Sequence, residues 1–275
     1  MIVVLFGCNG MLGSDLSMQF KDQDLHKFSR NDIDITSKKK VLEIIKKIKP
    51  DIVINAAAYT DVDGSEINRK KAMLVNATAV KYLALACCKY NSTLVHFSTD
   101  YVFDGENKNG YRENAKGNPI NFYGLSKLKG EDYIRKICRN KGYYIIRTQW
   151  LYGHNGKNFV DTIIKLSKEE DELKVVNDQF GSPTYTKDIA KKVKILIGNY
   201  DFGIYHITNS GVCTWYDFAK LILKLKNIKA KLIPITSKEL NRLAKRPKCL
   251  ILLNTKFKSK MRNWEAALRD YITTR

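Results

Sequence analysis

The sequence predicts an α/β fold in which a doubly wound parallel sheet is joined to a smaller C-terminal α/β lobe. In the first half of the chain, short runs of β-branched and other apolar residues alternate with helix-length stretches, at the spacing of βαβ units. The first apolar run is followed at once by a glycine-rich turn and a stretch that suits a helix. Beyond about residue 153 the alternation loosens, which indicates the second lobe.

The first strand and its turn have the composition of a phosphate site. Residues 2–6 (IVVLF) form a continuous apolar run, as expected of a strand buried on both faces. Gly7, Gly10 and Gly13 follow in the pattern G-x-x-G-x-x-G. These glycines permit a tight turn, close approach of the backbone to a pyrophosphate, and close packing of helix on strand. The N-terminus of the following helix favours an anion, so we expect a dinucleotide here, in a sheet of the Rossmann type.

The second and third strands are expected to meet the adenosine half of that dinucleotide. A short strand candidate at 25–29 ends at Arg30. In dinucleotide folds this position meets the ribose, where a basic residue favours a 2′-phosphate and an acidic one a free hydroxyl. After a helix at 38–48, a buried strand ends in Asn-Ala-Ala-Ala at 55–58, small residues that obstruct a nucleotide little. Arg30 thus favours NADPH over NADH.

The fourth and fifth strands add further residues at the same edge. They are predicted at 93–97 and 143–147, and a helix at 68–89 precedes the fourth. Ser98 and Thr99 directly follow the fourth strand. Because ligands bind at the carboxyl ends of parallel strands, these hydroxyls and the glycine turn should lie on one edge of the sheet.

The remaining segments are shorter and less regular. They comprise helices at 158–168, 188–197, 215–225 and 264–271 and strands at 173–177 and 203–208. We assign residues 1–150 to a dinucleotide-binding Rossmann domain. Residues 151–275 are assigned mainly to a substrate-binding lobe, with some of its segments returning to the first domain.

Length and composition narrow the classes of protein. With 275 residues, 44% of them hydrophobic, the chain can bury a large core. No run of ~18 apolar residues occurs, so no membrane span is expected, and the N-terminus lacks the charged region of a signal peptide. The six cysteines are scattered without a C-x-x-C pair. This spacing indicates reduced, mostly buried thiols in a cytoplasmic protein.

The formal charge of +20 raises the question of nucleic-acid binding. The lysines are spread over the whole length, and several fall on amphipathic helical patterns where lysine is the ordinary solvated residue. We therefore expect no nucleic-acid partner. A basic surface still favours an anionic substrate or cofactor, because it raises the local concentration of anions.

Tyr123 and Lys127 are the candidate reacting pair. Their spacing of four residues places them on one face of a helix, one turn apart. A free phenol has a pKa of ~10, so a neighbouring cation makes proton transfer near neutral pH more efficient. A Y-x-x-x-K pair alone is weak evidence. Because the glycine turn places a dinucleotide at the same sheet edge, we interpret the pair as a general acid and the cation that tunes it.

Several blocks of sequence resemble a known family. These are, in order, GCNGMLG, VINAAAYTDVD, FSTDYVFDG, YGLSKLKGE, RTQWLYG, NDQFGSPT and AKRPK. Together they resemble the extended short-chain dehydrogenase/reductases and, more narrowly, the dTDP-4-dehydrorhamnose reductases, over nearly the whole chain. The resemblance implies reduction of the 4-keto group of dTDP-4-dehydro-L-rhamnose to dTDP-L-rhamnose, in rhamnose biosynthesis. The hydride would come from NADPH (or NADH).

The resemblance also implies residue roles. Tyr123 would give its proton to the ketone oxygen, Lys127 would supply charge and contact the nicotinamide ribose, and Thr99 would hydrogen-bond the carbonyl, with Ser98 as its competitor. The implied cofactor-binding residues are Gly7, Asn9, Gly10, Met11, Leu12, Gly13, Arg30, Asp34, Ile35, Ala56, Ala57, Ala58, Tyr59, Ser98, Tyr123 and Lys127. The substrate-binding candidates are Tyr101, Phe103, Trp150 and Arg246.

No metal is expected in the chemistry. Some family members bind magnesium through acidic residues near the glycine turn at a dimer contact. Here Ser14 and Asp15 follow Gly13, which makes a bridging metal doubtful. A homodimer is possible.

Two alternatives to this function stay open. One is a reductase or epimerase of a different nucleotide sugar, with the same chemistry and another base or sugar. The other is a non-catalytic regulatory subunit similar to the methionine adenosyltransferase β subunit, which would bind a cofactor without turnover. The intact group of Thr99, Tyr123 and Lys127 argues against the second.

Overall fold

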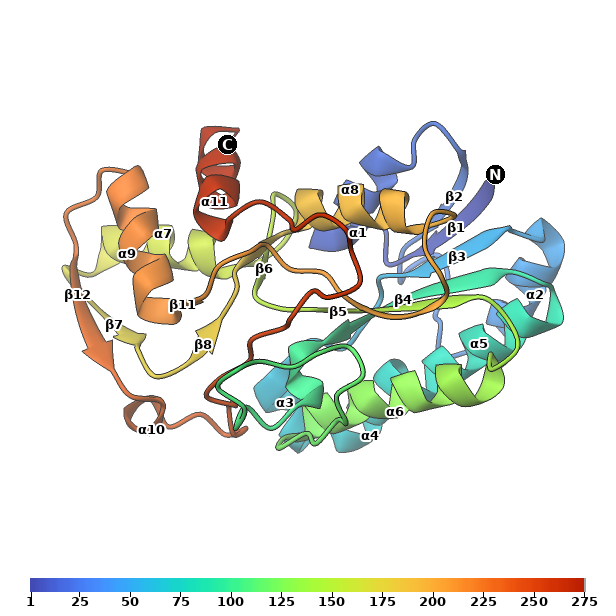
Figure 1. Cartoon of the computed structure of the whole chain (residues 1–275), viewed down its shortest axis with the longest axis horizontal. Coiled ribbons are helices and arrows are strands. Elements are labelled where there is room, and N and C mark those ends of the chain that lie inside the picture. The colour runs from blue at the N-terminus through green and yellow to red at the C-terminus, as the bar shows by residue number, and fades with distance from the viewer. Residues whose placement is uncertain (275) are drawn as a thin grey trace.

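A computed structural model describes residues 1–274, and its largest sheet has six strands, all parallel, with Rossmann-type topology. In chain order the strands are β1 (Ile2–Phe6), β2 (Asp24–Phe28), β3 (Ile52–Asn55), β4 (Thr93–Thr99), β5 (Tyr143–Thr148) and β10 (Gly203–His206). Their order across the sheet is β10-β5-β4-β3-β1-β2 (Figure 1). The predicted doubly wound parallel sheet is confirmed.

The direction of winding reverses at β1. The chain passes from β1 outward to β2 on one side and then returns to β3 on the other. Phe6 is in register with Phe28 on β2 and with Asn55 on β3. The residues that follow these strand ends therefore meet at one point of the carboxyl edge, the switch point where such sheets bind ligands.

Helices cover both faces of the sheet. The helices α1 (Met11–Gln19) and α8 (Thr186–Leu196) pack on one face, and α2 (Lys38–Ile48), α5 (Ala79–Lys89) and α6 (Phe122–Ile137) pack on the other. Successive residues of a strand point to opposite faces. Accordingly, one apolar core cluster contains Val3 and Leu5 and the other contains Val4 and Phe6.

The helical stretch predicted at 68–89 is formed by three consecutive segments. These are α4 (Arg69–Met73), the π-helical turn η1 (Leu74–Thr78) and α5, preceded by the short helix α3 (Val62–Ile67). By length and composition alone, Arg69–Lys89 could cross a membrane, although half of its most apolar window is buried inside the protein. Packing of α5 against α2 and α6 accounts for its apolar character.

The smaller lobe has a core of its own, at the left of Figure 1. Its elements are β6 (Leu151–Tyr152), α7 (Phe159–Glu169), β7 (Glu172–Val176), β8 (Phe180–Gly181), β9 (Thr184–Tyr185), β11 (Cys213–Thr214), α9 (Trp215–Leu225), β12 (Lys231–Ile235), α10 (Ser237–Leu240) and α11 (Trp264–Thr273). Two later segments instead belong with the large sheet: β10 is one of its strands, paired with β5, and α8 is one of its covering helices, packed on α1.

The strands β4 and β5 extend further at their carboxyl ends than the sequence indicates. The fourth strand extends to Thr99 and the fifth to Thr148, because Ser98 pairs with Arg147 and Thr99 with Thr148 in the β4–β5 ladder. The polar Ser-Thr and Thr-Gln sequences resemble loops, yet their backbones still pair. Ser98 and Thr99 are thus strand residues, held more rigidly than loop residues would be.

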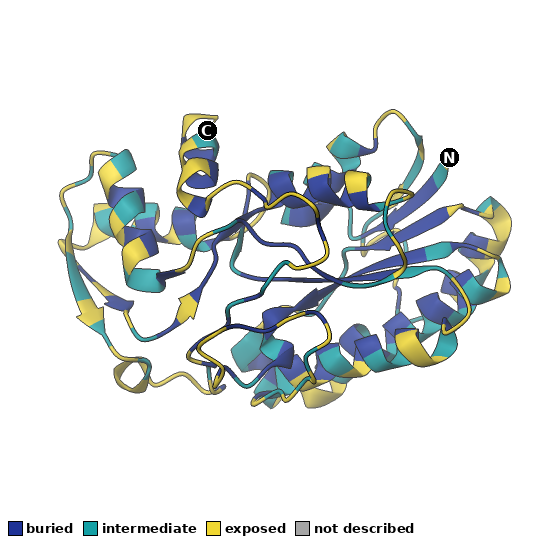
Figure 2. Cartoon of the chain, viewed as in Figure 1, coloured by how far each residue is buried: buried dark blue, intermediate teal, exposed yellow. Residues whose placement is uncertain are grey.

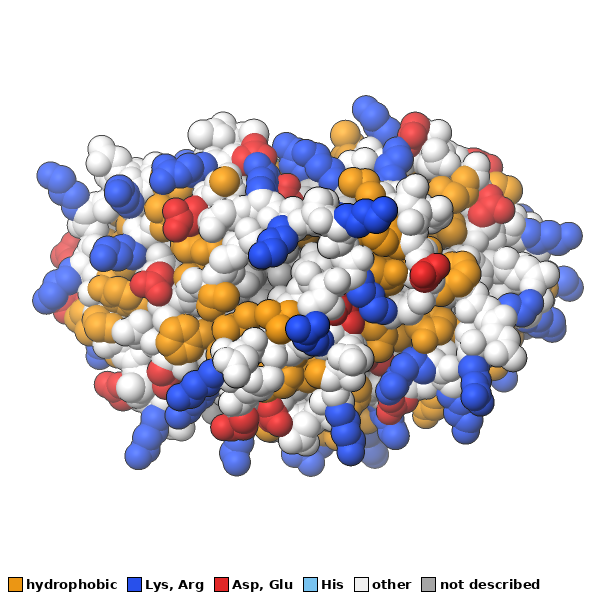
Figure 3. Space-filling view, viewed as in Figure 1, with side chains coloured by type: hydrophobic (Ala, Val, Ile, Leu, Met, Phe, Trp, Pro, Cys, Tyr) orange, Lys and Arg blue, Asp and Glu red, His pale blue; other side chains and the backbone are white. Residues whose placement is uncertain are grey.

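Burial follows this layered arrangement. Figure 2 shows the inner strands of the large sheet and the inward faces of its helices as buried, with exposed residues along the outer helix faces. Lys and Arg side chains are distributed around the whole of the face seen in Figure 3, with acidic side chains between them. All six cysteines are free thiols, four buried and two half-buried, as the sequence indicates.

Candidate active site

The glycine turn brings β1, β3 and α1 into close contact. Gly7 has φ +80°, and a Cβ on it would lie 2.7 Å from the Ala57 backbone nitrogen. A Cβ on Gly13 would lie 2.0 Å from the Gly7 carbonyl oxygen. Gly10 is the N-cap of α1 and has no side-chain capping bond, so the first-turn N–H groups of this helix, which begins at Met11, lack a capping partner. This cradle of backbone can hold an anionic group.

The segment after β2 leaves its arginine available. The carboxylates of Asp32 and Asp34 each accept bonds from nearby residues, Asp32 from Ser29 and Asp34 from Thr36. Arg30 is exposed and forms no ion pair within residues 1–274. Its guanidinium can therefore meet a phosphate.

The segment after β3 is fixed by a side chain from the π-helical turn. The Asn76 amide bonds both backbone polar groups of Tyr59: Tyr59 N donates to Oδ1 at 2.9 Å, and Nδ2 donates to Tyr59 O at 2.9 Å. The same Nδ2 lies 3.0 Å from the hydroxyl of Ser126 on α6. Ala56, Ala57 and Tyr59 are half-buried, and the first two lie beside Gly7 of the glycine turn. A single buried amide thus joins the β3 edge to α6.

Thr99, Tyr123 and Lys127 are brought together where β4 meets the start of α6. Asn121 caps this helix by accepting from Gly124 N at 2.8 Å. A Cβ on Gly124 would lie 2.0 Å from the Tyr101 carbonyl oxygen, so glycine lets α6 approach this loop closely. Thr99 is close enough to the Tyr123 phenol to lower its pKa.

Burial dominates the acid–base properties of the pair. It raises the pKa of Tyr123 to about 12, which the hydrogen bond from Thr99 opposes. It lowers the pKa of Lys127 to about 8, which the negative charge of Glu131 opposes. Lys127 Nζ donates to the Phe97 carbonyl oxygen at 2.6 Å. For Tyr123, burial thus outweighs the tuning expected from Lys127, and the phenol is protonated at neutral pH.

A buried carboxyl lies beside this group. Asp100 is 1% exposed; its Oδ1 accepts from the Thr99 hydroxyl at 2.9 Å, and its Oδ2 has no partner within the described residues. Burial raises the pKa of Asp100 to about 7, although the Thr99 bond opposes the shift. At neutral pH this carboxyl is therefore divided between its protonated and ionised forms.

Trp150 lies between β5 of the large sheet and α9 of the smaller lobe. It follows β5 with the left-handed φ of +47°, which is strained for a bulky residue. Its ring stacks on Trp215 of α9, with centroids 3.6 Å apart, and a Cβ on Gly181 would lie 2.7 Å from it. Trp215 in turn donates to the Gln179 amide oxygen at 3.1 Å. Strain maintained by packing marks this indole as a positioned side chain.

Arg246 makes its main contacts within the protein. Its Nη1 and Nη2 donate to the two carboxylate oxygens of Asp63 at 3.1 Å and 3.0 Å. Asp63 also accepts from Ala244 N at 2.9 Å. This bidentate pair joins the C-terminal loop to α3, so the charge of Arg246 is already compensated.

Two candidate ligand residues are placed in apolar cores. Phe103 is fully buried and stacks on Tyr111 with centroids 4.2 Å apart. Ile35 is 6% exposed and packs in the cluster that contains Val41 and Ile45. Phe103 has no exposed surface and Ile35 has little, because each completes a packed core. Tyr101, by contrast, is half-buried and meets the Tyr123 ring edge-on at 5.7 Å.

Two candidate site residues, Glu131 and Arg147, were not predicted from the sequence. Glu131 lies one turn beyond Lys127 on α6, and its carboxylate pairs with Arg147 at the end of β5, with Nη2 donating to Oε2 at 2.6 Å. The spacing Tyr123, Lys127, Glu131 places a third polar residue on the same helix face, and this signal was available in the sequence. The partner sixteen residues away was not apparent without the sheet register.

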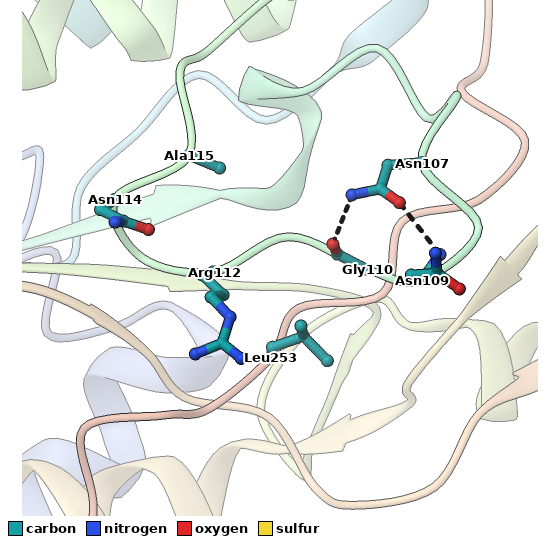
Figure 4. A pocket seen from close by; sticks show the side chains of 7 residues that line it. All are labelled: Asn107, Asn109, Gly110, Arg112, Asn114, Ala115 and Leu253. Carbon is teal, nitrogen blue, oxygen red and sulfur yellow. Dashed lines mark hydrogen bonds between the residues drawn. The ribbon is translucent and has the colours of Figure 1, made fainter.

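One cavity lies away from Thr99, Tyr123 and Lys127. The cavity of about 420 Å³ in Figure 4 is lined by Asn107, Asn109, Gly110, Arg112, Asn114, Ala115 and Leu253. None of these residues belongs to the predicted site. Within residues 1–274, no group of three or more His, Cys, Asp or Glu side chains is arranged to hold a metal ion. Asp15 instead accepts from the Thr186 hydroxyl at 2.5 Å.

Comparison with known proteins places the whole chain among sugar-nucleotide enzymes. A family model described as the RmlD substrate binding domain matches residues 1–275. The spore coat polysaccharide biosynthesis protein SpsK of Bacillus subtilis is 38% identical over 278 residues, covering 99% of this chain and 97% of the relative.

Solved structures agree in the whole fold. A dTDP-4-dehydrorhamnose reductase of Clostridium acetobutylicum has a TM-score of 0.96 and 41% identity, covering 100% of this chain and 99% of the other. The dTDP-4-dehydrorhamnose reductase of Bacillus anthracis, solved in complex with NADP, has a TM-score of 0.96 and 37% identity, with 100% of both chains covered.

Proposed function

This chain belongs to the RmlD substrate-binding-domain family, and from that premise we propose that it reduces the 4-keto group of dTDP-4-dehydro-L-rhamnose to dTDP-L-rhamnose, with NADPH (or NADH) as hydride donor. The observation that carries the proposal is the placement of Thr99, Tyr123 and Lys127 together at the edge where the glycine turn lies. Relatives with this activity in their names match nearly the full chain.

The residues present fit a dinucleotide. The Gly7–Gly13 turn leaves room that a single added Cβ would fill, and α1 directs its uncapped N-terminus at the same place. Backbone N–H groups at a helix N-terminus bind phosphates well. We propose that Arg30 meets the 2′-phosphate of NADPH and that Ala56 to Tyr59 lie beside the adenosine half. When bound, the nicotinamide supplies the hydride; the protein supplies position and the proton.

The proton is provided by Tyr123. The phenol is protonated near neutral pH, where burial raises its pKa further, and it can donate to the carbonyl oxygen as negative charge develops there. The single proton of the Thr99 hydroxyl is donated to Asp100 Oδ1 at 2.9 Å in this structure, so Thr99 would turn from Asp100 to the carbonyl oxygen when the substrate binds. Lys127 lies one turn away and stabilises the phenolate that remains after donation.

Substrate recognition is proposed for Tyr101 and Trp150. Both are half-buried, Tyr101 against the phenol and Trp150 at the end of β5. For Arg246 we propose an indirect role, since its bond to Asp63 holds the loop that carries it. The lobe formed mainly by residues 151–275 would hold the nucleotide sugar against the sheet edge. A cytoplasmic homodimer is proposed on the family alone; sedimentation velocity would test the assembly.

A panel of keto-sugar nucleotides tests the proposed substrate. Purified protein is mixed with NADPH and the dTDP-, UDP- or GDP-linked 4-keto sugar, and loss of reduced nicotinamide absorbance is followed. We expect the fastest loss with dTDP-4-dehydro-L-rhamnose and formation of dTDP-L-rhamnose. Faster turnover of a UDP or GDP sugar would reassign the substrate. Cofactor binding without turnover of any sugar would instead support a regulatory subunit.

A further inference from the structure

One face of α6 is bonded to the end of β4 at regular intervals. Tyr123, Lys127 and Glu131 recur every four residues and so project from the same face. Lys127 Nζ donates to the Phe97 carbonyl oxygen at 2.6 Å, and Ser98 Oγ donates to Glu131 Oε1 at 2.5 Å. Thr99, the next strand residue, is close enough to the phenol of Tyr123 to lower its pKa. The reacting pair and Glu131 therefore share one rigid contact between helix and strand.

Glu131 is anchored more firmly than either reacting residue. It is fully buried and accepts from Ser98, from Arg147 Nε at 2.9 Å and from Arg147 Nη2 at 2.6 Å. Arg147 is 2% exposed; its Nη1 donates to the Glu113 carbonyl oxygen at 3.3 Å, and its guanidinium lies over the Phe103 ring. A bidentate pair of this kind fixes both position and orientation.

Glu131 is the anionic side chain that acts on the pKa of Lys127. Glu131 opposes the loss of charge that burial imposes on the Lys127 ammonium. The other titratable groups around this site are Tyr123 on α6, His96 on β4, Asp100 after β4 and Arg147 on β5. His96 is fully buried, and burial holds its pKa well below the usual range, so it is neutral. On α5, Lys81 lies over the Tyr133 ring.

We propose that Glu131, held in place by Arg147, is a positioning residue that keeps Lys127 cationic and aligned beside Tyr123. The inference rests on the proposed reductase function, because Lys127 is assigned its role there. Arg147 matters through Glu131, because its two hydrogen bonds orient the carboxylate. The Lys127 ammonium keeps its bond to the Phe97 carbonyl oxygen, one turn from the phenol.

The test compares Glu131→Gln with a charge-balanced double variant, Glu131→Gln with Arg147→Met. The single variant leaves Arg147 buried and uncompensated, which destabilises folding; the double variant removes both charges and keeps the protein measurable. The control is Asp132→Asn, which removes an exposed carboxylate that pairs with Arg135 on the same helix. Each protein is first checked by circular dichroism and thermal unfolding.

Two readouts are followed across pH 6 to 10. The first is kcat for the keto sugar. The second is the titration of Lys127 by NMR of ¹³Cε-labelled lysine, assigned by comparison with Lys127→Met. In the double variant, we expect the Lys127 titration and the alkaline fall of kcat to move together to lower pH, by about one unit or more. In Asp132→Asn, both should coincide with wild type.

An unchanged Lys127 titration in a folded double variant would overturn the proposal. So would a lower kcat at every pH with no movement of the alkaline limb, which is the pattern of a purely structural residue. The NMR titration does not require turnover. If wild-type protein reduced no keto sugar while the titration still moved, the proposed function would fail and the electrostatic role of Glu131 would stand.

Discussion

At the scale of single residues, burial sets the protonation of the candidate site. The sequence led us to interpret Lys127 as the cation that tunes Tyr123, whereas burial is the largest influence on the phenol and raises its pKa to about 12. The physical reason is that both groups are withdrawn from water and that Lys127 Nζ is occupied by the Phe97 carbonyl oxygen. The phenol is protonated at neutral pH as a reduction requires, but the raised pKa makes it a weaker acid, so the phenolate left after donation depends on the Lys127 charge for stabilisation.

Asp100 should make stability depend on pH. Its folded pKa of about 7 lies above the usual 3.8, so the folded state retains a proton that the unfolded state has lost. The stabilisation is complete below about pH 4 and is lost as pH rises through 7. Between pH 5 and pH 8, this should lower the free energy of unfolding by about 3 kcal/mol.

The Asp100→Asn variant tests this dependence by urea unfolding at the two pH values. The amide does not titrate, so the decrease from pH 5 to pH 8 should be smaller in the variant than in wild type. An equal decrease in both proteins would mean that Asp100 ionises normally in the folded state.

Residue patterns revealed only part of this site. Tyr123 and Lys127 were predictable because the helical period fixes which residues share a face. The Arg147–Glu131 pair was not, because it depends on the register that sets Ser98 beside Arg147. The pairing of Arg246 with Asp63 was likewise invisible, since the two residues lie far apart in sequence.

At the scale of elements, the fit of α1 on the glycine turn should control both folding and cofactor binding. A Cβ on Gly13 would lie 2.0 Å from the Gly7 carbonyl oxygen, whereas one on Gly10 would lie 3.4 Å from it. Gly13→Ala should therefore lower the melting temperature by several degrees, corresponding to about 1–3 kcal/mol of overpacking.

Gly10→Ala is the matched variant for that experiment. It should melt near wild type, because its Cβ meets only one neighbour and its φ of −75° suits any residue. Its NADPH affinity should still fall, since the side chain would project where the backbone approaches a phosphate. Equal melting temperatures for Gly13→Ala and wild type, measured by calorimetry, would contradict the packing argument.

Regular elements were predicted well where periodicity was strong. The helix at 38–48 and the helix at 215–225 match α2 and α9 at both ends. The strand β12 was missed because Lys231–Ile235 is partly exposed and contains Pro234, which weakens the strand pattern. It pairs in parallel with β7, a long-range contact that local sequence does not encode.

At the scale of the whole molecule, Asp63 joins two distant parts of the chain. It lies on α3 and bonds Ala244 and Arg246 of the C-terminal loop. Asp63→Asn should raise the KM for the nucleotide sugar, because the loop loses its anchor, while the Kd for NADPH stays unchanged. The free energy of unfolding should fall by about 1 kcal/mol, since the pair is partly exposed.

Arg242→Met provides the control for this anchor. Arg242 Nη1 lies 3.8 Å from Asp63 Oδ2, and the arginine side chain is 58% exposed, so its removal should change neither constant. Steady-state kinetics for the sugar and fluorescence titration for the cofactor give the comparison. If Asp63→Asn changed the Kd for NADPH and left the KM for the sugar unaltered, the Asp63–Arg246 pair would support cofactor binding, which contradicts the prediction.

The central claim is that Tyr123 donates the proton in reduction of a keto-sugar nucleotide. Its most direct test is the rate of NADPH oxidation with dTDP-4-dehydro-L-rhamnose by Tyr123→Phe, beside wild type and Tyr133→Phe from the same helix. We predict a rate about 10²–10⁴-fold lower for Tyr123→Phe, with NADPH affinity retained, and a wild-type rate for Tyr133→Phe. Oxidation by Tyr123→Phe as fast as wild type would contradict the claim.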